Sequence, residues 1–197
     1  MNIHAFLRTL SRLAPALAAL CLSVACTEDI DMSNRYTFTE ETMLSYLQKQ
    51  PQYSQYVNLL DYVPVSSVSQ STIAQLLSAR GHYTCFAPNN EAIQLYLDSL
   101  QRKGIIPQAS WDAFPSEKVL DSIRKVIVYN SIIDGGDYIT YETGTFPLRD
   151  NEEFALANMN DRKLSVIRAK HNSDSIFING EALVSMKNRD IEVINGR

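Results

Sequence analysis

Histidine and cysteine are scarce in this chain, which limits the chemistry that it can perform. Only three of each occur among 197 residues. His82 and His171 have no neighbour at metal-ligand spacing, and both lie in polar stretches typical of solvated loops. The motifs HExxH, CxxC and G-x-S-x-G and the glycine-rich phosphate loop are also missing. We therefore expect no metal site, no cofactor and no catalytic residue.

Carboxylates, by contrast, are numerous but scattered. A glycoside hydrolase needs two acids that face each other across a cleft. Asp134, Asp137 and Glu142 are the side chains that could supply such a pair. Asp134, Asp137 and Asp150 could also bind calcium, although their spacing is not that of an EF-hand loop. A glycan hydrolase therefore stays open as an alternative.

One long apolar run occurs, close to the N-terminus. Arg8 and Arg12 precede the apolar residues 13–25, a run of the length of a signal-peptide core and too short for a secure membrane span. It ends in Ser23-Val24-Ala25-Cys26, which resembles a bacterial lipobox, where small residues precede the lipid-bearing cysteine. We expect residues 1–25 to be a lipoprotein signal peptide and Cys26 to carry a lipid such as palmitate. Ordinary signal-peptidase cleavage near Ala25 is the alternative.

The residues that follow Cys26 are polar and acidic. Residues 26–36 read as the lipidated cysteine with a solvated tether, and their acidity resembles the export signal of some Gram-negative outer-membrane lipoproteins. The chain has 18 Lys and Arg against 22 Asp and Glu, and removal of residues 1–25 would take away two arginines and no acid. This balance argues against a nucleic-acid partner, because phosphate binding needs a basic surface. The lipid would be the link to the membrane.

After processing, Cys85 is the thiol that remains in the folded part of the chain. An intramolecular disulfide is then impossible despite export to an oxidising compartment, so stability must come from a hydrophobic core. Cys85 lies in an apolar stretch and is expected to act as a small buried hydrophobe. Residues 37–197 are long enough for a single domain with a sizeable core.

Apolar periodicity predicts helices in the first half of the domain and strands in the second. Helical spacing predicts helices over residues 37–49, with Thr39 as cap, over 54–63 and over 71–77, then one capped by Asn89 and broken by Gly104, and one from Ser116 through Ile127. After a turn at residues 134–137, alternating segments predict strands over 138–142, 145–148, 154–157, 163–169 and 175–178. Asn179-Gly180 predicts a tight hairpin. This order indicates an α+β domain.

One stretch joins a buried strand to a helix without an intervening loop. Pro88 removes a backbone donor and pushes Ala87 into an extended conformation, so the strand must end there. Asn89 can then cap the helix, and Glu91 places negative charge in its first turn. The residues Phe86, Ala87, Pro88, Asn89, Asn90, Glu91 and Ala92, with Thr84 and Ile93 beside them, resemble T-x-F-A-P-[TN]-[ND]-E-A-[FI], the first motif of the fasciclin-type adhesion domain, FAS1. We interpret these residues as structural.

The resemblance covers about residues 39–197. It implies the FAS1 fold, in which helices pack on a β-sandwich or wedge of short strands, with the final strand apparently truncated at Arg197. Residues 178–180 and 190–196 resemble the family's Asn-Gly hairpin and the start of its second motif. Tyr129 and Asn130 stand where the family has a Tyr-His pair linked to adhesion, which makes them candidate recognition residues. Asn130 replaces the histidine, and its first interpretation is a buried hydrogen-bonding residue.

The resemblance implies a non-enzymatic adhesion or recognition lipoprotein of the bacterial cell envelope that binds extracellular protein or glycan. The outer membrane, with exposure at the cell surface, is the expected location. A structural module of a larger multi-domain surface protein or complex, and an envelope glycan hydrolase, are the alternatives. The loops 101–114 and 134–151 are candidate binding surfaces, because recognition is often carried by loops on a rigid scaffold. Four tyrosines could contact sugars, but we expect them to line the core with their hydroxyls at its rim; they are Tyr46, Tyr53, Tyr56 and Tyr62.

Overall fold

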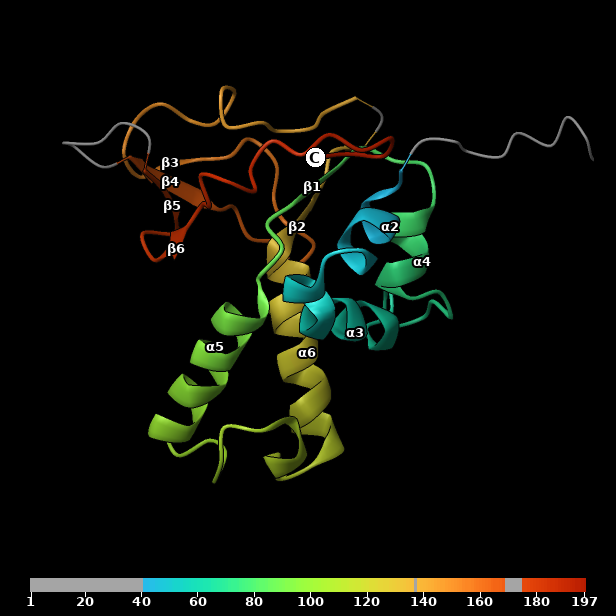
Figure 1. Ribbon diagram of the computed structural model, residues 1–197, viewed down its shortest axis with the longest axis vertical. Helices are drawn as coiled ribbons and strands as arrows, with labels where there is room; N and C mark the ends of the chain where they lie inside the picture. Colours follow the sequence, from blue (N-terminus) through green and yellow to red (C-terminus); the bar gives the residue numbers. More distant parts are fainter. Residues whose placement is uncertain (1–40, 137, 169–174) are drawn as a thin grey trace, which may run out of the picture. The chain divides into compact units, whose positions relative to one another are not determined.

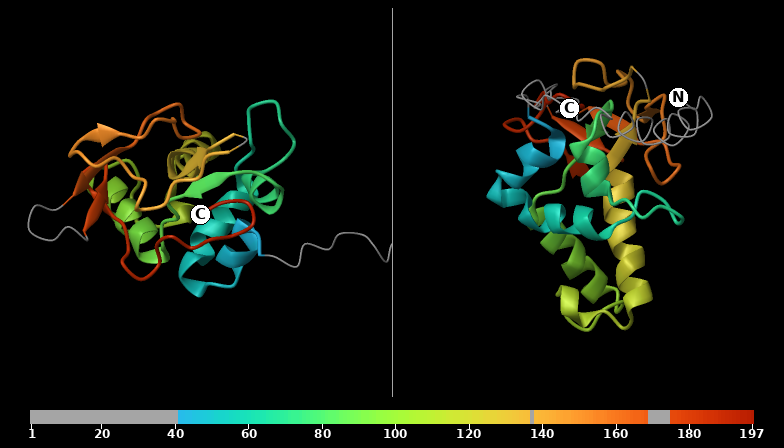
Figure 2. Two further views of the ribbon diagram at one scale, coloured as in Figure 1. Left: turned by 90° about the horizontal axis from the view of Figure 1, so that it is seen from above. Right: turned by 90° about the vertical axis from the view of Figure 1, so that its right-hand side faces the viewer.

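The computed structural model describes residues 41–136, 138–168 and 175–197, which belong to one compact unit (Figures 1 and 2). Helices come first and strands later, which agrees with the predicted α+β class at that coarse level. The helices of the described chain are α2 (Met43–Gln48), α3 (Ser54–Tyr62), α4 (Ile73–Ser78), α5 (Asn90–Arg102) and α6 (Glu117–Ser131). The strands are β1 (Tyr83–Cys85), β2 (Ile132–Asp134), β3 (Glu152–Glu153), β4 (Ser165–Arg168), β5 (Ile176–Ile178) and β6 (Ala182–Leu183).

The short helices α2 and α4 begin at side-chain caps. The Thr42 side chain accepts a hydrogen bond from the Ser45 amide, so α2 begins at Met43. The expected cap, Thr39, lies outside the described residues, and the first helix of the described chain therefore starts later than predicted. In α4, Thr72 and Gln75 form a reciprocal capping box, in which each side chain accepts a hydrogen bond from the other residue's amide.

The two long helices largely follow their sequence signals. Ser116 caps α6 as predicted, by accepting a hydrogen bond from the Val119 amide. Gly104, with φ of +69°, follows the end of α5 as predicted. Helix α6 continues to Ser131, past the predicted end at Ile127. Val126, expected on the apolar face of this helix, is 39% exposed.

Two separate antiparallel sheets form from the strands. β1 pairs with β2, with Thr84 opposite Ile133. The other sheet has the order β3-β4-β5-β6. In the hairpin between β5 and β6, Asn179 and Gly180 have φ of 52° and 74°, which confirms the predicted turn.

Three of the predicted strands are wrong. Residues 138–142, 145–148 and 154–157 contain no regular strand among their described positions, and β3 lies just ahead of the last segment. Some backbone amides of this region bond to side chains, and others bond to nearby carbonyls without forming a regular strand ladder. The Tyr141 amide donates to Thr84 Oγ1, and the Glu142 amide donates to Thr145 Oγ1. The alternating pattern here reflects which side chains are buried, namely Phe146 and Phe154.

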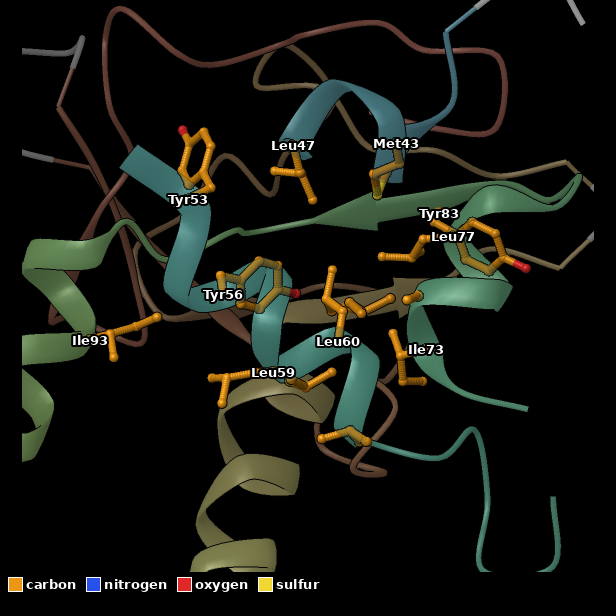
Figure 3. Packing of buried hydrophobic residues seen from close by; sticks show 14 of the residues in the cluster. Met43, Leu47, Tyr53, Tyr56, Leu59, Leu60, Ile73, Leu77, Tyr83 and Ile93 are labelled. Atoms are coloured by element: carbon orange, nitrogen blue, oxygen red, sulfur yellow. The ribbon is translucent and has the colours of Figure 1, made fainter. Parts of the chain in front are cut away.

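The core has two parts. The larger part lies among the helices and β1, where side chains from α2, α3, α4 and α5 point toward one another (Figure 3). Tyr56 and Leu60 of α3 are completely buried at its centre. The smaller part lies against the four-stranded sheet and contains Phe146, Phe154 and Val166. Each large apolar side chain that is fully buried contributes about 1.5–3 kcal/mol to stability, so the helical part is the main source of stability.

The last residues of the chain tie the helices to β1. Residues 195–197 lie parallel to β1 (Figure 1), and the Tyr83 amide donates to the Asn195 carbonyl at 3.0 Å. The Asn195 side chain is 1% exposed and makes three hydrogen bonds. Its Oδ1 accepts from the Met43 amide at 2.8 Å, and its Nδ2 donates to the Leu77 and Ala79 carbonyls at 2.7 and 2.8 Å. One side-chain amide thus provides hydrogen-bond partners for a backbone amide at the start of α2 and for two backbone carbonyls at the end of α4.

Replacement of Asn195 by alanine should lower the free energy of unfolding by about 3 kcal/mol or more, because a buried polar group left without a partner costs about 1–3 kcal/mol. Urea unfolding followed by circular dichroism measures the effect. Asn58→Ala, at an exposed position of α3, is the matched control and should change the free energy by less than about 0.5 kcal/mol. Equal stabilities of the two variants would contradict this role of Asn195.

Candidate functional site

The strand-to-helix junction has the predicted local structure. β1 ends at Cys85 and α5 begins at Asn90, with the side chain of Asn89 accepting from the Ala92 amide at 2.8 Å. Glu91 lies in the first helical turn. The junction therefore fixes the direction in which α5 leaves the sheet.

Asn90 fastens this junction to the neighbouring helix. Its Oδ1 accepts from the Gln55 amide at 3.0 Å. Its Nδ2 donates to the Pro51 carbonyl and to Ser54 Oγ, both at 3.0 Å. These contacts hold the start of α5 against the start of α3, so the polar part of the motif is engaged in local structure.

The apolar part of the same motif lines a large cavity of about 970 Å³. This volume is at the upper end of the range of ligand pockets. The rest of the wall comes from α2, β1, α5, α6, parts of the segment 141–164, the β5–β6 hairpin and the segment that follows β6. Five of the seven motif residues line the cavity, namely Phe86, Ala87, Pro88, Asn89 and Ala92. The remaining apolar lining includes Leu95, Tyr96, Val126, Ile127, Phe146, Ile178, Leu183 and Val184.

The charged side chains of the cavity wall are mostly basic. Arg162, Lys163, Arg189 and Arg197 line it, against Glu181 and Asp190. Arg197 is held by Glu142 and Glu192, at 3.8 and 3.4 Å. The Asp190 carboxylate accepts two hydrogen bonds from Thr143, one of them from its amide at 2.6 Å. The cavity thus combines apolar walls with positive charge, in a chain with a net charge of −4.

The two predicted recognition residues do not act as a pair. Asn130 lines the cavity, and its side-chain oxygen accepts hydrogen bonds from Asn158 and Asn160 at 3.3 and 3.1 Å. Tyr129 does not line it, and its hydroxyl donates to the Pro64 carbonyl at 2.6 Å. Burial raises the pKa of the Tyr129 hydroxyl. The structure therefore brings Asn130 to the cavity and places Tyr129 elsewhere.

A small polar cluster adjoins the cavity wall, which includes Cys85 and Ser131. The Tyr56 hydroxyl is 2.6 Å from Ser131 Oγ and 3.5 Å from Cys85 Sγ, and the Ser131 hydroxyl donates to the Val128 carbonyl. Burial raises the pKa of the Cys85 thiol to about 11, and the hydrogen bond with Tyr56 acts in the opposite direction. Burial also raises the pKa of Tyr56 well above its ordinary value. At neutral pH both groups are neutral, so Cys85 is a poor nucleophile.

The candidate acids have local structural partners. Asp134 is exposed and its carboxylate accepts from the Gly136 amide, and Asp150 accepts from the Arg168 amide. Glu142 faces Arg197. Asp137 and His171 lie outside the described residues, and His82 is exposed. Within the described ranges, no three His, Cys, Asp or Glu side chains gather as metal ligands.

The two candidate loops differ in exposure. In loop 101–114, Trp111 stacks on Phe114 and donates to Gln55 Oε1 at 3.1 Å, so its aromatic residues pack on the helices. In the described part of loop 134–151, Tyr138 is 89% exposed. No helix in the described part of the chain is long and apolar enough to cross a membrane.

The tyrosines near the first helices divide between core and surface. Tyr53 and Tyr56 belong to the core, as expected. Tyr62 does not, because it is 66% exposed and the Arg124 guanidinium lies 4.5 Å from its ring centre. Tyr46 is half-buried and lines the cavity together with Tyr53.

Several residues of the cavity wall carry no sequence motif. Arg162, Lys163 and residues 182–185 belong to an irregular segment and a short strand. Only the resemblance to the FAS1 motif points to the importance of the Asn-Gly pair at residues 195–196. Comparison with known proteins finds no protein-family model that matches the chain and no significant match among curated proteins.

Alkylation of Cys85 by iodoacetamide at neutral pH should be about 100-fold slower in the folded protein than in urea, because a pKa of about 11 in place of 9.0 lowers the thiolate fraction by that factor. Mass spectrometry of the peptide that contains Cys85 gives the rate as a function of pH. Tyr56→Phe removes the hydrogen bond that lowers this pKa and should slow the reaction further. Equal rates in folded and unfolded protein would rule out a desolvated thiol.

Proposed function

We propose that this chain is a non-enzymatic recognition lipoprotein of the bacterial cell envelope, built on a FAS1-like domain, with Cys26 as its lipid attachment site. The observation that carries the proposal is the cavity of about 970 Å³ walled by the Phe86–Ala92 motif. Motif residues that fix the scaffold also shape the wall of a ligand-sized hollow. Its ligand is an extracellular or envelope protein or glycan.

Three structural features support the FAS1-like fold. The motif junction is a strand that passes directly into a capped helix. The Asn-Gly pair at residues 179–180 forms the hairpin turn, and Asn179 Oδ1 accepts from the Ser165 amide at 2.9 Å. Asn195-Gly196 lies beside β1. Each place where the sequence resembles the family is a place where a polar side chain or a glycine organises the backbone.

The chemistry of the cavity supports binding over catalysis. Its thiol is protonated at neutral pH because burial raises the pKa of Cys85 to about 11. The Glu142 carboxylate is paired with Arg197, and the exposed Asp134 carboxylate caps a turn. A general acid–base pair requires two acids free to face one substrate, whereas apolar walls with a few polar groups are typical of recognition sites.

Metabolic labelling with radioactive palmitate tests the anchor. We expect the label on the wild-type chain and on Cys85→Ser, whose thiol is desolvated inside the fold. Cys26→Ser should lose the label and should move from the membrane to the soluble fraction. Label that persists on Cys26→Ser would place the lipid on another residue.

Binding of the purified chain, solubilised in detergent, to arrays of glycans and extracellular-matrix proteins tests recognition. A saturable hit at physiological salt is expected, and Ala92→Trp should weaken it about tenfold or more by filling the cavity. Ala92 and Ser122 are both small, exposed helix residues, and Ser122 does not line the cavity, so Ser122→Trp is the control. A hit that is indifferent to Ala92→Trp would remove the cavity from the binding surface.

A further inference from the structure

Two Asn-Gly pairs occur in the chain, at residues 179–180 and 195–196, and the fold places them in opposite environments. The backbone nitrogen of such a glycine can attack the side-chain carbonyl carbon of the asparagine, because glycine has no Cβ to hinder the approach. The glycine amide gives its proton to hydroxide, its nitrogen bonds to Cγ, and the Cγ–Nδ2 bond breaks. Nδ2 takes a proton from water and leaves as ammonia. Water then opens the cyclic imide at either carbonyl, which gives aspartate or isoaspartate.

The pair Asn195-Gly196 is closed to this reaction in the folded protein. The Asn195 side chain is 1% exposed, and it makes three hydrogen bonds with backbone groups at the start of α2 and the end of α4. The attacking group is engaged as well, because the Gly196 amide donates to the Val193 carbonyl at 3.2 Å. The attack would have to break these hydrogen bonds, so it requires this part of the fold to open first.

The pair Asn179-Gly180 is open to the same reaction. Both residues are exposed in the turn of the β5–β6 hairpin, where their φ angles are 52° and 74°. Neither the Gly180 amide nor Asn179 Nδ2 has a hydrogen-bond partner among the residues that the structure describes. The attacking nitrogen and the leaving nitrogen are thus both available.

Strand β4 holds the remaining reacting group, the side-chain carbonyl of Asn179. The Asn179 amide donates to the Ser165 carbonyl at 2.8 Å, and the Ser165 amide donates to Asn179 Oδ1 at 2.9 Å. Negative charge develops on Oδ1 when the glycine nitrogen attacks, and a backbone N–H fixed beside developing charge stabilises it. This hydrogen bond therefore polarises the carbonyl and leaves Nδ2 unrestrained.

We propose that Asn179 is a site of spontaneous deamidation in the folded protein, with Gly180 as the nucleophile and the Ser165 amide as the group that stabilises the oxyanion. Asn195 is protected from the same reaction until the chain unfolds. The reaction consumes water, releases ammonia and replaces a neutral side chain by a carboxylate. This modification site is independent of the proposed recognition function.

The fold tolerates the aspartate product at one position and not at the other. The Asn179 side chain acts as an acceptor, a role that a carboxylate keeps, and aspartate also suits this type of turn. The Asn195 side chain donates to two backbone carbonyls, which a carboxylate cannot do, and its charge would be buried among them. Deamidation of Asn179 therefore leaves a folded protein, whereas deamidation of Asn195 in an unfolded chain prevents refolding.

Peptide mapping by mass spectrometry tests the proposal. Trypsin places the two pairs in different peptides, residues 171–187 and 190–197. Incubation of the purified chain in mildly alkaline, heavy-oxygen water labels each new carboxylate, and fragmentation assigns the label to a residue. In the folded chain, Asn179 should react within about tenfold of its rate in urea, and Asn195 should react more than about 100-fold more slowly than in urea.

Three variants test the roles of these residues. Gly180→Asn keeps a residue that accepts positive φ and adds a Cβ beside the attacking nitrogen, so it should slow the reaction at Asn179 about tenfold or more. Asn179→Asp should leave the urea midpoint unchanged, and Asn195→Asp should lower it or abolish folding. Chains that are aged in urea and then refolded should contain aspartate at position 179 and unmodified Asn195.

Each of the other results contradicts a definite part of the proposal. A folded chain that gains no label at Asn179, while both pairs react in urea, would show that the hairpin turn is closed to the reaction. Equal rates at Asn179 and Asn195 in the folded chain would overturn the protection of Asn195. Refolded chains with aspartate at position 195 would overturn the difference in tolerance.

Discussion

The described fold depends on the side-chain amide of Asn195. Helix ends leave backbone groups without partners, and buried polar groups must be satisfied. Asn195 satisfies the Met43 amide at the start of α2 and the Leu77 and Ala79 carbonyls at the end of α4. Its own carbonyl meanwhile accepts from β1. Three elements that lie far apart in the sequence therefore share one buried group, and none of them is complete until residues 195–197 are in place.

Gly196 explains why this arrangement tolerates little change. A side chain at this position would place its Cβ 2.0 Å from the Tyr83 carbonyl oxygen, and the φ of +155° lies in a region that glycine favours. The close approach is required because the Arg197 amide must reach the same Tyr83 carbonyl, at 2.9 Å. In the pair Asn195-Gly196, the Asn195 side chain bonds three backbone groups. Gly196 has no side chain, so residues 195–197 can approach β1 closely enough for their backbone hydrogen bonds.

Local features of this fold could be predicted because they depend on neighbouring residues. Asn89 and Ser116 cap helices as expected, since a cap needs only its own side chain and the amide three residues on. The strands expected at residues 138–148 do not form, because a strand needs a neighbouring strand to pair with. Here the Tyr141 amide donates its hydrogen bond to Thr84 Oγ1 instead. The cavity could not be predicted at all, because its wall joins segments as distant as Met43 and Arg197.

The polar and the apolar residues of the Phe86–Ala92 motif have different roles, and this difference bears on the proposed specificity. Its polar members bond to backbone, as Asn89 does in capping α5 and Asn90 in fastening α3, so they contribute geometry and little selectivity. Its apolar members present an unspecific surface. On the proposed recognition function, selectivity would come from residues outside the motif, of which Arg162 and Lys163 carry charge without a described ionic partner. They lie between Asn158, whose side chain holds the local turn, and Leu164, which is buried in the smaller core, so both can vary without disturbing either fixed point. On the proposed function, we therefore expect changes at these two cations to alter the ligand preference without disturbing the fold.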